Sequence, residues 1–254
     1  MKIVGMVPAR LESSRLPEKA LVDILGLPMV VHTCKRAQLS SSLNEVYLVT
    51  DNLKIKEVGE RYDLNVIMTK SDHKTGSDRI AEAADHVEAD IIVNIQGDEP
   101  LVEPDHIDKI VQPLIDSQDL QVSCGVTSFT KRNSYSDIKA VLDLEGNILY
   151  CSRTDIPSDS RSEVHYLNRM CFIIPFRKSF LKQYTSWGPT PLEQIEYNEY
   201  LRILEHGVKM KAVIIEDAKI SVDTIDDLNE VREMMKHDVI RKRYQNLKRQ
   251  PTQD

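Results

Sequence analysis

The side chains best suited to bind an anion lie in a loop near the amino terminus. Ile3–Val7 is a short apolar run, typical of a strand buried on both faces in a parallel sheet. After Pro8 the chain becomes polar and supplies cationic and hydroxyl groups at Arg10, Ser13, Ser14, Arg15 and Lys19. A loop that directly follows a buried strand lies at the edge where open α/β sheets bind ligands. The loop therefore suits a highly charged anion such as a triphosphate, and a solvated basic loop is the alternative.

A second polar segment follows a second buried strand. Ile91–Ile95 is predicted to be a buried strand, and it delivers Gln96, Gly97, Asp98 and Glu99 to the same predicted sheet edge. A carboxylate at the end of a strand, opposite a basic phosphate loop, suits a Mg²⁺ ion that bridges phosphate oxygens. The alternative is an acidic turn that caps the next helix, because Asp beside Gly is ordinary turn chemistry.

A third polar segment, Asp72–Arg79, runs into a predicted helix over Ile80–His86. Thr75, Gly76 and Ser77 precede that helix and have the composition of a helix cap. Backbone amides beside a glycine can approach a flat ring closely, and a nucleobase is one candidate. A plain N-cap and turn is the other interpretation.

Composition excludes several classes of protein. The chain has 254 residues, 41% of them hydrophobic and 29% charged, which is ordinary for a soluble α/β protein. A net charge of -7 argues against a nucleic-acid-binding surface. The four cysteines are far apart and favour buried thiols of a reducing compartment over disulfides or a zinc site. Without an apolar leader or an 18-residue apolar run, we expect a cytoplasmic protein that does not enter a membrane.

Strands and helices alternate through the first hundred residues, which predicts an α/β fold with a doubly wound, mostly parallel sheet and helices on both faces. We expect a single domain over residues 1–254. Within it, residues 120–190 form a smaller β-rich region that supplies acceptor and dimer contacts. Asn168–Phe176 is a further apolar run, and we predict a helix over Thr190–Gly207 and a helix over Leu228–Lys248.

Five motifs occur together in the order and spacing of a known family: Val7–Lys19, Asn94–Pro100, Ser152–Arg153, Pro191–Glu196 and Ser221–Thr224. From about residue 2 to about residue 235, the chain resembles the 3-deoxy-manno-octulosonate cytidylyltransferases, or CMP-Kdo synthetases. The resemblance implies a Rossmann-like nucleotidyltransferase that couples CTP to the sugar acid Kdo and releases pyrophosphate. It also implies a Mg²⁺ cofactor, a homodimer and a role in lipopolysaccharide biosynthesis.

The resemblance also assigns roles to residues. The nucleotide-binding set is Pro8, Ala9, Arg10, Ser13, Arg15, Lys19, Thr75, Gly76, Ser77, Gln96 and Asp98. Arg10, Lys19 and Asp98 are its catalytic members, and Asp98 and Asp223 are the implied Mg²⁺ ligands. The acceptor-binding set is Arg153, Met170, Glu196, Glu199 and Tyr200. An acceptor carboxylate needs a cation, and Arg153 is suited to bind it in a bidentate manner.

Three positions depart from the family pattern. Glu18 replaces a glycine in the first loop, Arg169–Ile174 replaces a His-Leu-Gly-Ile-Tyr type of strand, and Tyr200 replaces a glutamine. The last two changes remove hydrogen-bonding groups from the segment that shapes the sugar pocket in the family. Three alternatives therefore stay open: a cytidylyltransferase for another acid, a transferase that uses a different nucleotide, and a non-catalytic nucleotide-binding homologue.

Overall fold

The chain divides into two compact units. The computed structural model describes residues 1–13 and 16–245. Unit 1 comprises Met1–Asp108 together with the chain from Lys219 onward, and unit 2 comprises Lys109–Ala218. No helix among the described residues is both long enough and apolar enough to cross a membrane.

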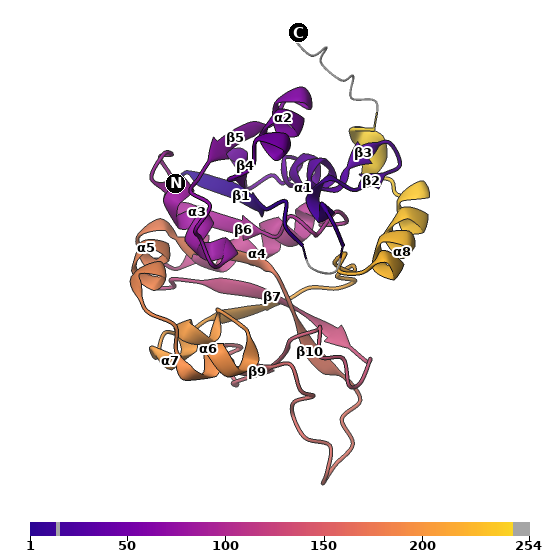
Figure 1. Ribbon diagram of the computed structural model, residues 1–254. Helices are drawn as coiled ribbons and strands as arrows, with labels where there is room; N and C mark the ends of the chain where they lie inside the picture. Colours follow the sequence, from indigo (N-terminus) through magenta and orange to yellow (C-terminus); the bar gives the residue numbers. More distant parts are fainter. Residues whose placement is uncertain (14–15, 246–254) are drawn as a thin grey trace. The chain divides into compact units, whose positions relative to one another are not determined.

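Unit 1 is built on parallel strands β1 (Ile3–Ala9), β4 (Glu45–Thr50), β5 (Asn65–Met68) and β6 (Ile91–Ile95), which neighbour one another in the order β6-β1-β4-β5. Every residue of β1 and β6 is buried, as their continuous apolar sequences predict. The crossover helices are α1 (Met29–Ala37), α2 (Leu53–Arg61) and α3 (Gly76–Ala84) (Figure 1). Right-handed crossovers put α1 and α2 on one face and α3 on the other, so the predicted fold class is confirmed.

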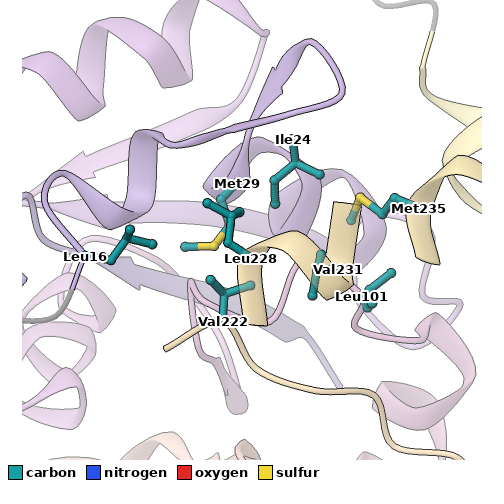
Figure 2. Packing of buried hydrophobic residues seen from close by; sticks show 8 residues of the cluster. All are labelled: Leu16, Ile24, Met29, Leu101, Val222, Leu228, Val231 and Met235. Atoms are coloured by element: carbon teal, nitrogen blue, oxygen red, sulfur yellow. The ribbon is translucent and has the colours of Figure 1, made fainter. Parts of the chain in front are cut away.

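The carboxyl-terminal part of the chain returns to the amino-terminal part within unit 1. Helix α8 (Ile225–Lys236), yellow in Figure 1, lies beside strand β2 (Asp23–Ile24), which pairs with β3 (Leu27–Pro28). Side chains of both elements belong to an apolar cluster, shown in Figure 2, that consists of Leu16, Ile24, Met29, Leu101, Val222, Leu228, Val231 and Met235. Burial of each such side chain contributes about 1.5–3 kcal/mol, so this apolar cluster fastens α8 to the first thirty residues.

The predicted helix over Leu228–Lys248 is wrong at both ends. Helix α8 begins at Ile225, because Thr224 and Asp227 form a capping box, and it ends at Lys236. Beyond it, the Asp238 carboxylate accepts two hydrogen bonds of 2.9 and 3.0 Å from the fully buried Arg36. A short 3-10 helix, Arg241–Arg243, follows. The chain leaves the helix at this point because a buried guanidinium needs an anionic partner. Residues 246–248 of the prediction lie outside the described residues.

Unit 2 contains a mixed sheet in the order β12-β7-β10-β8-β9. Its strands are β7 (Ser123–Phe129), β8 (Lys139–Leu142), β9 (Ile148–Ser152), β10 (Leu167–Cys171) and β12 (Lys211–Ile214). Strand β12 is parallel to β7, and the other pairs are antiparallel. The remaining elements are β11 (Ile173–Arg177), α5 (Lys178–Ser186) and α4 (Pro104–Asp116), which runs from unit 1 into unit 2.

The apolar run over Asn168–Phe176 forms parts of two strands, β10 and β11. The ladder between β10 and β7 ends at the Cys171–Gly125 pair, and β11 begins two residues later. Phe172 lies between the two strands and stacks on Tyr200, with ring centroids 6.0 Å apart. The aromatic contact divides what reads in sequence as one continuous apolar run.

The single helix predicted over Thr190–Gly207 is also wrong. Helix α6 (Pro191–Glu196) and helix α7 (Leu201–Glu205) are separated by Tyr197, whose backbone is left-handed at φ 49° and ψ 47°. The Arg153 guanidinium donates to the carbonyl oxygens of Glu196 and Tyr197, at 2.7 and 3.0 Å. Those carbonyls are thus satisfied without a continuing helix.

Contacts between the two short helices hold the break in place. Glu193 in α6 and Arg202 in α7 form a buried ion pair. Glu205 accepts a hydrogen bond of 3.1 Å from the backbone N–H of Leu192. The predicted stop is confirmed, since Gly207 follows α7 with φ +73°.

The break at Tyr197 predicts how a glycine substitution there changes the free energy of unfolding. Tyr197 is 85% exposed, so its loss removes little packing. We expect Tyr197→Gly to leave the free energy of unfolding unchanged or raise it by up to about 1 kcal/mol, because glycine adopts positive φ without strain. Gln194→Gly, at an exposed position inside α6, should lower it by about 0.5–1 kcal/mol. Equal losses in urea denaturation would indicate a continuous helix instead.

His32 on α1 predicts a pH dependence of stability. Its Nε2 donates to the Ile24 carbonyl at 2.8 Å, so Nδ1 of the neutral ring accepts from the Tyr244 hydroxyl at 2.9 Å. Burial lowers the pKa of His32 from 6.5 to about 4. The native state therefore remains neutral where the unfolded state binds a proton. We expect the free energy of unfolding to fall by about 1.4 kcal/mol per pH unit from pH 6.5 toward pH 4.

Urea denaturation across that pH range checks this expectation. His32→Gln should remove this part of the slope, while His165→Gln, at a largely exposed position, should keep it. An unchanged slope in His32→Gln would assign the pH dependence to other groups.

Candidate active site

The predicted nucleotide residues of unit 1 meet where β1 and β6 end. Gly97 follows β6 so closely against β1 that a Cβ atom on it would lie 2.8 Å from the Pro8 carbonyl oxygen. A Cβ atom on Gly76 would lie 3.5 Å from both the Gln96 amide nitrogen and Pro8 Cγ. Pro8, Gly76 and Gln96 are therefore neighbours, although they come from three separate segments. Ala9, the last residue of β1, is buried beside them.

The predicted metal ligands Asp98 and Asp223 converge on Lys19. The ammonium nitrogen of Lys19 donates to Asp98 Oδ2 at 2.7 Å and to Asp223 Oδ1 at 2.9 Å. The three side chains are 14%, 31% and 28% exposed, respectively. Burial on its own would lower the pKa of Lys19, but the two carboxylates outweigh burial and raise the pKa. Lys19 is therefore a charged ammonium at neutral pH.

Backbone contacts position the two aspartates. The Val222 N–H donates to the Asp98 carbonyl at 3.0 Å, and the Ser221 hydroxyl donates to Glu99 at 2.6 Å. The Asp223 N–H donates to the Asp227 carboxylate, which also caps α8. The apolar cluster includes residues close in sequence to each charged group: Leu16, Leu101 and Val222 (Figure 2).

The chemistry of this group fits a hard divalent cation. Both ligands are carboxylates, and a single cation already lies within hydrogen-bond distance of both. Among the described residues there is no cluster of three or more His, Cys, Asp or Glu side chains that could hold a metal. Two carboxylates nevertheless match Mg²⁺, which is commonly bound by one or two carboxylates plus substrate phosphates.

The segment at Thr75 is a true helix cap. Helix α3 begins at Gly76 rather than at Ile80, since Thr75 and Asp78 form a reciprocal capping box. Gly76 and Ser77 therefore lie in the first turn, where backbone N–H groups lack partners inside the helix. The Ser77 hydroxyl is buried without a hydrogen-bond partner in the described part of the chain. The cap interpretation is correct, and the cap also lies beside Gln96.

Two ion pairs outside the predicted site fix the position of this segment. Glu82 in α3 contacts His73 and accepts from the Lys70 N–H, which ties the preceding loop to the helix. Arg79 donates to Thr69 at 2.8 Å and to Asp51 at 3.2 Å, which ties α3 to the ends of β5 and β4. Sequence reasoning missed both pairs. The only available signal was a charged residue beside the buried Ile80 at the start of a helix.

The first loop is described in part. Arg10 is exposed and Ser13 half-buried, whereas Ser14 and Arg15 lie outside the described residues. Glu18 has a left-handed backbone at φ 48°, a conformation that favours glycine. Its carboxylate pairs with Lys54 at 2.9 Å. The negative charge that Glu18 adds is therefore paired outside the Lys19 group.

In unit 2, Arg153 and Glu196 are hydrogen-bonded to each other and to neighbouring residues. The Arg153 guanidinium donates to three backbone carbonyls, those of Tyr135, Glu196 and Tyr197. Burial alone would raise the pKa of the Glu196 carboxyl, but hydrogen bonds from the Arg153 N–H and the Ser152 and Tyr150 hydroxyls outweigh it and lower the pKa. Glu196 is thus an ionised acceptor of three hydrogen bonds.

The other predicted acceptor residues are buried or half-buried. Met170 on β10 and Tyr200 are almost fully buried. Glu199 is half-buried, and its carboxylate accepts from the Tyr184 hydroxyl at 3.3 Å. The departures at Met170 and Tyr200 therefore change packing inside unit 2.

The two glycines of the site predict contrasting effects on stability. Gly97→Ala should lower the free energy of unfolding by about 1–3 kcal/mol, because the new methyl group meets a backbone oxygen that cannot move aside. Gly76→Ala makes only ordinary van der Waals contacts and should stay within about 0.5 kcal/mol of the parent protein. Urea denaturation of both variants checks this, and equal values would contradict the close approach of β6 to β1.

Known proteins resemble this chain over most of its length. Residues 4–212 match the family model described as cytidylyltransferase. The 3-deoxy-manno-octulosonate cytidylyltransferase of Geobacter metallireducens is 37% identical over 249 residues, covering 92% of this chain and 98% of the relative. The mitochondrial enzyme of the same name from Arabidopsis thaliana is 37% identical, covering 92% and 83%.

A solved structure has the same fold. It is that of CMP:2-keto-3-deoxy-manno-octonic acid synthetase complexed with CTP, and it matches with a TM-score of 0.89 and 32% identity, covering 93% of this chain and 99% of that one. The sequence match and the structural match extend over nearly all of both proteins. This chain belongs to the cytidylyltransferase family, among the 3-deoxy-manno-octulosonate cytidylyltransferases.

Proposed function

We propose that this protein couples CTP to 3-deoxy-manno-octulosonate (Kdo), forming CMP-Kdo and releasing pyrophosphate, with Mg²⁺ as its cofactor. The observation that supports this best is the convergence of Lys19, Asp98 and Asp223 in unit 1. A cation and two carboxylates from distant segments form the charged centre that nucleotidyl transfer needs. The relatives named for this reaction match along almost their whole length.

The nucleotide lies, in this proposal, against the ends of β1 and β6. Arg10 and Lys19 neutralise the phosphates, as a forked and a point charge respectively. Gln96 and the first turn of α3 read the cytosine ring, since an amide side chain and backbone N–H groups match its polar edge. Arg15 and Ser13 add further donors to the phosphates.

Asp98 and Asp223 would hold Mg²⁺, and the ion when bound would supply positive charge that neutralises the phosphate oxygens. The protein's own contribution is to keep both carboxylates in place. The hydrogen bond that the Asp98 carbonyl accepts and the one that the Asp223 N–H donates hold the two residues in place.

Unit 2 supplies the acceptor residues in this proposal. Arg153 uses three of its five N–H groups on backbone carbonyls, which leaves two, among the contacts described, for the acceptor carboxylate. Glu196 orients Arg153 by accepting from its backbone N–H at 2.9 Å. The anomeric hydroxyl of the acceptor then attacks the α-phosphorus in line with the departing pyrophosphate.

We also propose a homodimer in the cytoplasm. Unit 2 exposes apolar side chains at Leu149, Ile195 and Ile214, which suits contact with a second copy. All four cysteines are buried and free of disulfides, which suits a reducing compartment. Light scattering coupled to size-exclusion chromatography measures the oligomeric state.

Pyrophosphate release from CTP, Mg²⁺ and Kdo tests the activity. We expect turnover by the parent protein and a loss of at least about a hundredfold in Asp98→Asn and in Asp223→Asn, because each removes charge stabilisation at the reacting phosphate. Asp226→Asn is the matched control, since Asp226 is an exposed acid in the first turn of α8 and belongs to no part of the Lys19 group.

Other outcomes would redirect the assignment. Release with another acid but not with Kdo would identify a different acceptor. Competition by ATP or UTP would identify a different nucleotide. CTP binding without release for any acid would identify a non-catalytic homologue, and in that case Asp98→Asn would leave the protein's function intact.

A further inference from the structure

Lys19 lies where a metal ion would be expected to lie. In the proposed function, Asp98 and Asp223 are the ligands of Mg²⁺. In this structure, their facing oxygens are both hydrogen-bonded to the Lys19 ammonium, at 2.7 and 2.9 Å. Each of these two oxygens is therefore already hydrogen-bonded to a cation. The same two carboxylates therefore serve two competing cations.

The ammonium has a reason to remain there while no nucleotide is bound. Two carboxylates held this close repel each other, and a shared cation removes that repulsion. The hydrogen bonds are charge-assisted and the Lys19 side chain is mostly shielded from water, so the contact is stronger than that of an exposed pair. A metal ion that arrives alone must break both hydrogen bonds, and the Lys19 ammonium then loses both carboxylate partners.

A bound triphosphate changes that balance. Its oxygens are acceptors for the displaced ammonium, so Lys19 exchanges carboxylates for phosphates. The exchange requires only a side-chain movement, because a lysine stem has four rotatable bonds. The backbone on either side is anchored, since Leu16 belongs to the apolar cluster and Ala20 is buried (Figure 2).

We infer that Lys19 is the resident counter-cation of Asp98 and Asp223 in the nucleotide-free protein, and that it excludes the divalent ion until a nucleotide draws its ammonium away. This inference rests on the proposed function, which supplies the metal and the triphosphate. Its consequence is an order of binding: the metal enters with the nucleotide and not before it.

Mn²⁺ binding to nucleotide-free protein, measured by electron paramagnetic resonance, tests the inference. We expect weak binding by the parent protein and at least about tenfold tighter binding by Lys19→Met, which keeps the length of the side chain and removes its charge. Lys54→Met is the matched control. Lys54 is a nearby lysine paired with exposed Glu18, and its loss should leave Mn²⁺ affinity unchanged.

Thermal unfolding gives a second readout that does not depend on activity. In EDTA, Lys19→Met should melt below the parent protein, because both carboxylates lose the ammonium that they share. Mn²⁺ should raise its melting temperature and leave that of the nucleotide-free parent protein almost unchanged. If Lys19→Met does not fold, Lys19→Gln replaces it, since glutamine also removes the charge.

The outcomes separate the inference from the proposed function. Equal Mn²⁺ affinity in the parent protein and Lys19→Met, abolished by Asp98→Asn, would overturn the exclusion by Lys19 and leave the metal site intact. Failure of Lys19→Met to bind Mn²⁺ either alone or with CTP, together with full activity of Asp98→Asn, would overturn the metal site and with it the proposed function.

Discussion

The structure of the site depends on holding two carboxylates of like charge side by side. Asp98 follows a central strand and Asp223 precedes the last helix, so chain connectivity does nothing to bring them together. The Lys19 ammonium removes their repulsion, and the apolar cluster supplies the force that brings their segments to the same place. Charge alone would give a weak, water-screened contact, whereas burial of the cluster fixes the geometry in which the charge acts.

Much of this site could be predicted because parallel strands deliver their carboxyl ends to one edge. That rule alone predicts that Pro8 and Gln96 lie at the same edge. Gly97 shows how closely the end of β6 approaches the end of β1. The contact between Lys19 and both aspartates could not be predicted in the same way. A lysine in a phosphate loop and a carboxylate at a strand end have separate explanations in sequence, and only the tertiary fold shows that they neutralise each other.

Two of the errors in the predicted helices have the same physical cause. Periodicity reports which face of a segment is apolar, but it does not report distant polar partners. Arg153 binds the carbonyls that end α6, and Arg36 binds the aspartate that follows α8. In both cases a guanidinium far away in the sequence satisfies backbone or carboxylate oxygens, and the chain departs from the helix that local pattern favours. For the same reason, Arg153 reads in sequence as a ligand for substrate while most of its donors serve the backbone.

Glu18 shows how the site tolerates a residue with a side chain in a conformation that favours glycine. Its backbone occupies the left-handed region at a cost of about 1–2 kcal/mol for a residue with a side chain. Its carboxylate could have joined Asp98 and Asp223 around Lys19, and a third acid would have held the ammonium more tightly. Lys54 instead pairs with Glu18. Among the described contacts, the Lys19 ammonium therefore pairs with two carboxylates rather than three, so a doubly charged cation that arrives with a nucleotide can still displace it.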